Sequence, residues 1–204
     1  LIDRDDFPSD TISTHMIHVQ GVAAMNRWGI LDAFDTGDTP KLRQMSFAMG
    51  PISVTGNVPS HEGLDYFIAP RRYLFDKHLV DSAVEAGAEL YTGINIRELV
   101  TEDGVVTGVT GYDRDGIPVQ FDATVVIGAD GMNSRIARLV DAKEYRNQPS
   151  LTACYIAYWT GTGITEPMVY FRDGNCIGII PTNQGQVVIW VQFPRERMDT
   201  FKKD

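Results

Sequence analysis

The stretch at positions 125–138 constrains the fold of this chain more than any other. Residues 125–127 form a short apolar, β-branched run, which is typical of a strand covered on both faces. Gly128 and Gly131 follow this run and allow a sharp turn and a close approach of the backbone to another group. The pattern therefore predicts a buried strand that leads into a glycine-rich turn.

A helix is predicted to start directly after this turn, because Asn133 or Ser134 can cap it. A turn of this kind directs backbone N–H groups and a helix N-terminus at one point, which suits a phosphate or an oxyanion. The residues alone fit an ordinary strand-to-helix turn of an α/β protein equally well, because a short glycine turn is weak evidence for a ligand.

Residues 128–131, Gly-Ala-Asp-Gly, with Ser134 after them, resemble the internal "GADG…S" motif of flavoprotein monooxygenases with the p-hydroxybenzoate hydroxylase fold. Geranylgeranyl reductases and flavin-dependent halogenases share this fold. Two further stretches agree in order and spacing. Residues 1–4 resemble the end of the second Rossmann strand, and residues 71–79 resemble the family's R-x-x-L-D-x-x-L helix, with Phe75 at the first leucine position. The resemblance extends through essentially the whole chain.

The resemblance implies which residues bind FAD. Asp3, with Arg4 beside it, corresponds to the acid at the adenosine ribose, and Arg72 corresponds to the arginine that contacts phosphate or ribityl oxygens. Asp130 and Gly131 correspond to the turn beside the cofactor. Read alone, Asp3 also fits a solvated acid at a strand end. No catalytic residue is assigned, because no acid–base pair stands out.

Arg71 and Arg72 stand near the predicted start of a helix, where the helix macrodipole favours acids over bases. An anionic ligand would offset this unfavourable placement. Arg71 is the less suitable of the two, because the motif places Arg72 at the cofactor.

The implied fold is α/β, a Rossmann-type FAD-binding domain with an inserted antiparallel β-sheet substrate domain. Residues 1–40 and 70–148 are assigned to a partial FAD-binding domain, and residues 41–69 and 149–204 to the substrate domain. The family's opening G-x-G-x-x-G fingerprint and its later Gly-Asp motif are absent from the sequence. We therefore expect the chain to be the middle portion of a longer protein.

Hydrophobic periodicity predicts helices at residues 17–28 and 70–87 and an aromatic strand at 66–68, which either walls a substrate pocket or belongs to the core. Further short strands are expected within 41–58 and at 94–100, 105–112, 117–121, 152–159, 168–172, 175–180 and 186–193. The candidate pocket aromatics are Tyr158, Trp159, Tyr170 and Trp190. About half of them must point elsewhere, because strand side chains alternate between faces.

The composition excludes several classes of protein. A formal net charge of −9 argues against nucleic-acid binding, which needs a basic surface. No apolar run approaches the roughly 20 residues that span a bilayer. Cys154 and Cys176 are interpreted as buried thiols, which together with the soluble composition predicts a cytoplasmic protein. His15 and His18 lack a neighbouring carboxylate or cysteine, so a flavin or substrate contact is a better hypothesis than a metal site.

The family resemblance implies an enzyme in which NAD(P)H reduces FAD and O₂ adds to give a peroxyflavin. One oxygen atom then passes to a small organic molecule, which we expect to be aromatic or polyketide-like. Two alternatives stay open: a flavoprotein similar to geranylgeranyl reductases, and a truncated fragment without catalytic activity. The sequence does not determine the oligomeric state.

Overall fold

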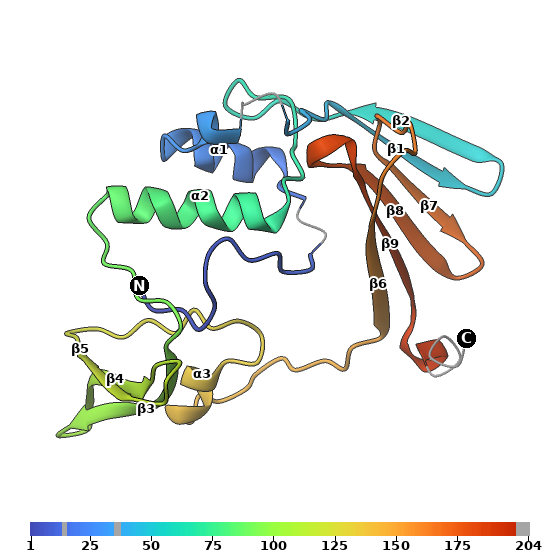
Figure 1. Cartoon of the computed structure of the whole chain (residues 1–204). Coiled ribbons are helices and arrows are strands. Elements are labelled where there is room, and N and C mark those ends of the chain that lie inside the picture. The colour runs from blue at the N-terminus through green and yellow to red at the C-terminus, as the bar shows by residue number, and fades with distance from the viewer. Residues whose placement is uncertain (14–15, 35–37, 199–204) are drawn as a thin grey trace. The chain divides into compact units, whose positions relative to one another are not determined.

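The computed structural model describes residues 1–13, 16–34 and 38–198 (Figure 1). The chain divides into two compact units. Residues 1–7 and 83–148 form the first unit, and residues 8–82 and 149–204 form the second. Which part of the chain binds FAD and which part binds substrate stays a prediction.

The first unit contains a three-stranded antiparallel sheet in the order β3-β4-β5. Its strands are β3 (Asn95–Glu102), β4 (Val105–Tyr112) and β5 (Pro118–Asp122), and a short helix α3 (Arg135–Leu139) follows. These elements confirm the predicted β-meander and the helix after the turn. Two glycines of β4 have no room for a side chain: a Cβ on Gly108 would lie 2.4 Å from the Phe121 carbonyl oxygen of β5, and one on Gly111 would lie 2.3 Å from the Asn95 carbonyl oxygen of β3.

The predicted buried strand at 125–127 is wrong. These residues form no strand, and the side chains of Val125 and Ile127 are 70% and 84% exposed. A strand covered on both faces needs neighbouring strands to complete its backbone hydrogen bonds. Within the part of the chain that the structure describes, no strand pairs with this segment.

The second unit contains a six-stranded sheet in the order β2-β1-β7-β8-β9-β6 (Figure 1). The strands are β1 (Gln44–Met49), β2 (Ile52–Asn57), β6 (Thr152–Trp159), β7 (Met168–Arg172), β8 (Asn175–Pro181) and β9 (Val187–Pro194). The predicted sheet was entirely antiparallel, whereas β1 and β7 pair in parallel. These two strands are far apart in the sequence, so no tight turn forces them to run in opposite directions. The mixed α/β fold class is confirmed.

Two helices precede and follow the β1–β2 hairpin. The helix before the hairpin is α1 (Val19–Arg27), which leads into a 3₁₀ turn, η1 (Leu31–Phe34). The helix after the hairpin is α2 (Arg72–Glu85). Both predicted helices are confirmed. Among the described residues, no helix has the length and apolar character needed to cross a bilayer.

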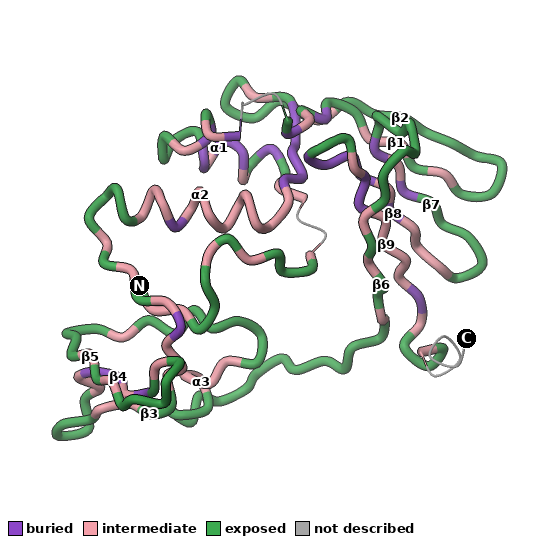
Figure 2. Tube along the Cα trace, viewed as in Figure 1, coloured by how far each residue is buried: buried purple, intermediate pink, exposed green. Residues whose placement is uncertain are grey.

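The core of the second unit has two clusters, which appear as the buried stretches in Figure 2. In one, Val22 and Met25 of α1 pack with Phe34, Tyr66 and Ile68. In the other, five residues from the sheet and the chain before α2 pack together: Leu42, Phe67, Ala69, Ile180 and Val188. The aromatic segment at 66–68 is thus core, the plainer of its two predicted roles.

Candidate functional site

Asp130 and Ser134 close the glycine turn of the first unit. The Asp130 carboxylate accepts hydrogen bonds from Ser134 Oγ at 2.5 Å and from the backbone N–H groups of Arg135 at 2.5 Å and Ile136 at 3.1 Å. Ser134 Oγ in turn accepts from the N–H of Ala137 at 2.9 Å and so caps α3, as predicted. The hydrogen bond from Ser134, with those from the two backbone N–H groups, lowers the pKa of Asp130.

These bonds correct one expectation about the turn. The N–H groups at the start of α3 do not point together at a ligand position, because the side chains of Asp130 and Ser134 occupy them. What the turn does offer is room at Gly131, whose φ is +82°. No described atom lies within 4 Å of the position that a Cβ on Gly131 would take, so its backbone is open to an approaching group.

Asp3 lies at the end of a short extended segment of the first unit. Ile2 forms a parallel bridge with Tyr91, and the Asp3 N–H donates to the Tyr91 carbonyl at 2.9 Å. The Asp3 carboxylate is half-buried and accepts from the N–H of Asp5 at 2.8 Å. A carboxylate can accept about four hydrogen bonds, so capacity for ribose hydroxyls remains. Arg4 points elsewhere, into an exposed pair with Asp5 at 3.4 Å.

Arg72 is the first residue of α2 and forms a fork with Asp76 one turn later. Its Nε and Nη2 atoms each donate to the Asp76 carboxylate at 2.7 Å. The hydrogen bonds to Asp76 raise the pKa of Arg72. The two side chains are only 30% and 15% exposed, which fixes the plane of the guanidinium. A guanidinium has five N–H donors, so donors remain for an anionic oxygen.

Arg71 has a different environment from its neighbour. Its guanidinium lies 3.6 Å from the ring centroid of Tyr158, donates to Gln186 Oε1 at 2.5 Å and forms an ion pair with Asp10. The Arg71 side chain is only 13% exposed. Arg71 is therefore held inside the protein. That Arg72 and not Arg71 contacts FAD stays a prediction.

The backbone at the start of α2 is fixed by the turn between β8 and β9. The Arg71 N–H donates to Asn183 Oδ1 at 2.9 Å, and Asn183 Nδ2 donates to Thr39 Oγ1 at 2.7 Å. Asn183 is 1% exposed. Sequence reasoning missed Asp10, Asn183 and Gln186, because each meets Arg71 only through the tertiary fold and none belongs to a motif.

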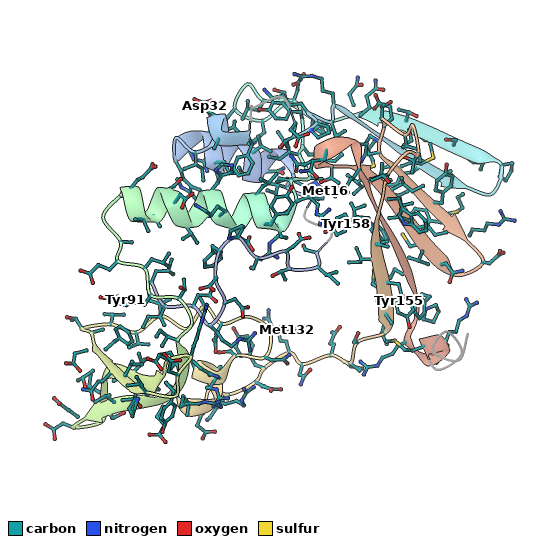
Figure 3. The ribbon with its side chains drawn as sticks, in the orientation of Figure 1. Met16, Asp32, Tyr91, Met132, Tyr155 and Tyr158 are labelled. Carbon is teal, nitrogen blue, oxygen red and sulfur yellow. The ribbon has the colours of Figure 1, made fainter. Side chains whose placement is uncertain are left out.

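One face of the six-stranded sheet carries two of the four predicted pocket aromatics. Tyr158 pairs with Val188 and Trp190 pairs with Ile156, so both lie on the face of the second core cluster. Trp159 and Tyr170 occupy the alternate positions of their strands and belong to the opposite face. Figure 3 shows the same alternation along β6, where Tyr155 and Tyr158 lie on opposite sides. The expectation that about half would point elsewhere is confirmed.

The environments of the two cysteines differ from the prediction. Cys154 is exposed and Cys176 is half-buried, so the prediction of two buried thiols is wrong. Their positions in the strand register put them on the same face of the sheet as Trp190, beside the second core cluster and not within it. His15 lies outside the described residues, and His18 has its ring 6.5 Å from that of Phe67. In the described chain, no three His, Cys, Asp or Glu side chains are placed to hold a metal ion.

The fold is shared with solved flavin-dependent enzymes. PqsL, described as a probable FAD-dependent monooxygenase of Pseudomonas aeruginosa, superposes with a TM-score of 0.80 and 16% identity, over 100% of this chain and 56% of that one. The myxobacterial chondrochloren halogenase CndH, a FAD-dependent halogenase, superposes with a TM-score of 0.83 and 16% identity, over 98% of this chain and 48% of that one. These superpositions show that the chain shares its fold with these two proteins.

The family follows from the sequence itself. The model of the FAD binding domain family matches residues 1–203, and the chain belongs to this family. A curated relative, digeranylgeranylglycerophospholipid reductase 2 of Methanopyrus kandleri, is 34% identical over 128 residues, which are 60% of this chain and 32% of the relative. The chain thus spans about a third of this relative and about half of the two solved structures.

Each unit, taken by itself, contains residues whose chemistry suits contact with FAD. In the first unit, the open backbone at Gly131 and the remaining acceptor capacity of Asp3 suit close contact with a polar cofactor. In the second unit, the fixed guanidinium of Arg72 suits an anionic oxygen. The assignment of Asp3, Arg4, Arg72, Asp130 and Gly131 to FAD stays a prediction.

Proposed function

We propose that the protein is an FAD-dependent oxidoreductase that takes electrons from NAD(P)H and acts with O₂ on a small organic substrate, as a monooxygenase. The observation that carries this proposal is the match of residues 1–203 to the FAD binding domain family. NAD(P)H as reductant, O₂ as co-substrate and a cytoplasmic location are parts of the same proposal.

The cofactor would supply the redox chemistry, and the residues of the chain would bind and orient it. Arg72, held by Asp76, would contact a phosphate or ribityl oxygen. Asp3 would accept hydrogen bonds from ribose hydroxyls. The Gly131 backbone would lie against the cofactor, while the Asp130 carboxylate keeps the turn in shape. Arg4 is the weakest of the assigned contacts, because its side chain is exposed and turned to Asp5.

The substrate would lie on the sheet of the second unit. The face that carries Tyr158 and Trp190 is mainly apolar, and the protein's part there would be to bind the substrate and exclude water. No acid or base of this chain is assigned a proton-transfer step.

A second candidate function is favoured by one specific observation. The curated relative from Methanopyrus is a digeranylgeranylglycerophospholipid reductase, and it is 34% identical to this chain over 128 residues. The two solved structures are only 16% identical to the chain, and an identity that low supports the fold alone. In this alternative the reduced flavin would deliver its electrons to carbon–carbon double bonds of an isoprenoid lipid instead of O₂.

The two candidates differ in the fate of the electrons. The full-length gene product would be reduced with NADPH under nitrogen and then given digeranylgeranylglycerophospholipid without oxygen. The monooxygenase proposal predicts no reoxidation of the flavin by the lipid, and ¹⁸O in the product when a panel of phenols and polyketide quinols is supplied under ¹⁸O₂. Anaerobic reoxidation with a gain of two hydrogens per saturated double bond, seen by mass spectrometry, would establish the reductase instead.

A further inference from the structure

Strand β2 forms one edge of the six-stranded sheet. Within the described part of the second unit, β1 pairs with one side of β2 and no strand pairs with its other side (Figure 1). Every residue of the strand, Ile52–Asn57, is exposed. The backbone on the outer side of β2 is therefore accessible to another strand.

The register of the β1–β2 hairpin shows which backbone groups of β2 point outwards. The Val58 N–H donates to the Arg43 carbonyl at 2.8 Å, and hydrogen-bonded and non-hydrogen-bonded pairs alternate along an antiparallel ladder. By this alternation, the N–H and C=O groups of Ser53, Thr55 and Asn57 point away from β1. Among the described residues, none of these backbone groups has a hydrogen-bond partner. The outer side of β2 thus offers a row of donors and acceptors.

Strand β2 lacks the features that usually keep an edge strand from pairing, which are charges, prolines within the strand and bulges. No charged residue occurs at positions 44–57, although the chain carries a formal net charge of −9. Pro51 lies in the turn before β2 and not within the strand. The register with β1 is unbroken from Ile52 to Asn57. The edge is therefore regular and uncharged.

The outer edge of β2 is complementary to itself. When two copies of β2 run antiparallel with Thr55 opposite Thr55 of the second copy, Ser53 of each copy lies opposite Asn57 of the other. All of these positions are then hydrogen-bonded pairs, so the two copies exchange about six backbone hydrogen bonds. The side chains on this face are hydroxyls and an amide, which form favourable cross-strand pairs.

The opposite face of the same pairing is apolar and has room for its side chains. Val54 of one copy lies opposite Gly56 of the other, and Ile52 lies opposite Val58. No described atom lies within 4 Å of the position that a Cβ on Gly56 would take. The side chains of Ile52 and Val54 are 65% and 61% exposed, so pairing removes apolar surface from water.

A second copy of the chain matches the symmetry of this edge. The outward-pointing positions are centred on Thr55, with Ser53 and Asn57 at equal distances on either side. Two copies of an acidic chain repel each other, but no charge lies on this edge to add to the repulsion. Pairing of the strands covers a strip about 20 Å long, much less than a standard interface, so the association is expected to be weak.

We propose that two copies of the protein associate through β2, antiparallel about a two-fold axis at Thr55, and so join their six-stranded sheets into one continuous sheet. The inference concerns the second unit alone and goes beyond the proposed function, because it involves neither flavin nor substrate.

The first test is sedimentation velocity of the full-length gene product over a range of concentrations up to several hundred micromolar, as a weak interface requires. Thr55→Lys places two like charges directly opposite each other at the two-fold axis. Met49→Lys places the same charge on the exposed neighbouring strand β1, away from the edge, and is the matched control. Both side chains are exposed, so both variants are expected to fold, which circular dichroism verifies.

The second test reads the register directly. In a Cys154→Ser, Cys176→Ser background, single cysteines are introduced by Thr55→Cys or Ser53→Cys and oxidised. Hydrogen-bonded pairs bring the two Cα atoms at position 55 to about 5.5 Å, within the range of a disulfide. The two residues at position 53 are offset by four positions along the strands, about 14 Å, which is too far.

The expected result is concentration-dependent dimerisation of wild type and Met49→Lys, with at least about tenfold weaker association of Thr55→Lys. Thr55→Cys should form the intermolecular disulfide at least about tenfold faster than Ser53→Cys. A wild-type protein that stays monomeric at every concentration would overturn the proposal. So would equal association of the two lysine variants, or equal rates of disulfide formation, since the copies would then meet through another surface.

Discussion

The indole ring of Trp190 lies over Gly178, so that a Cβ atom added to Gly178 would lie 2.1 Å from Trp190 Cε2. The two residues are paired on the neighbouring strands β8 and β9. A residue without a side chain at 178 is what allows the large ring to lie flat against the sheet.

Gly178→Ala is therefore expected to destabilise the protein by about 1–3 kcal/mol, because the added methyl group must displace the ring. Urea denaturation followed by tryptophan fluorescence measures this change. In a Trp190→Leu background, where the ring is absent, the same substitution should cost much less. An equal cost in both backgrounds would show that the ring is not the obstacle.

The buried amide of Asn183 supports a second prediction. Asn183→Ala removes the acceptor for the Arg71 N–H and the donor to Thr39, and leaves Thr39 unpaired in a buried environment and the Arg71 N–H in a partly buried one. The free energy of unfolding should fall by about 2 kcal/mol or more. Gln184→Ala, on the neighbouring residue, is the control, because the hydrogen bond from Gln184 to Asp38 comes from its backbone N–H and survives the substitution. A similar loss in both variants would contradict the role of the Asn183 side chain.

The Asp130 cap gives a prediction for pH. Its pKa is lowered in the folded state, first by Ser134, so the stabilisation is complete above the ordinary Asp pKa of about 4 and is lost as the pH falls through the lowered value. The difference in melting temperature between wild type and Asp130→Asn should thus be constant from pH 7 to about pH 5 and shrink towards pH 3. A difference that persists unchanged to the lowest pH would refute the role of the charge.

The helices and hairpins of this chain could be predicted from sequence, because periodicity, proline and glycine are local signals. The α2 helix and the β-meander illustrate this. The strand prediction at 125–127 was wrong because an apolar run indicates only that burial is favourable. A strand also requires neighbouring strands that pair with it. The local pattern carried no information on whether such neighbours exist.

The residues of the candidate site also differ in whether sequence alone could identify them. Arg72 and the Asp130 turn could be found because each belongs to a short motif. Arg71 could not be assigned its role, because it meets Asp10 and Gln186 across 61 and 115 positions of sequence. The parallel pairing of β1 with β7 was equally hidden, because alternation within single strands does not reveal which strands pair.

The proposed function requires that the protein binds FAD and that Arg72 contacts the cofactor. A flavin titration of the full-length gene product, followed by absorbance, tests this most directly. Arg72→Ala is compared with Lys77→Ala, which removes another basic residue of α2 with an acidic partner one turn later. Wild type should bind flavin, and Lys77→Ala should bind it with an affinity within about twofold of wild type. Arg72→Ala should lose affinity by about tenfold or more, at least about 1.4 kcal/mol. A wild-type protein that binds no flavin, or an Arg72→Ala variant that binds it as tightly as Lys77→Ala, would contradict the account.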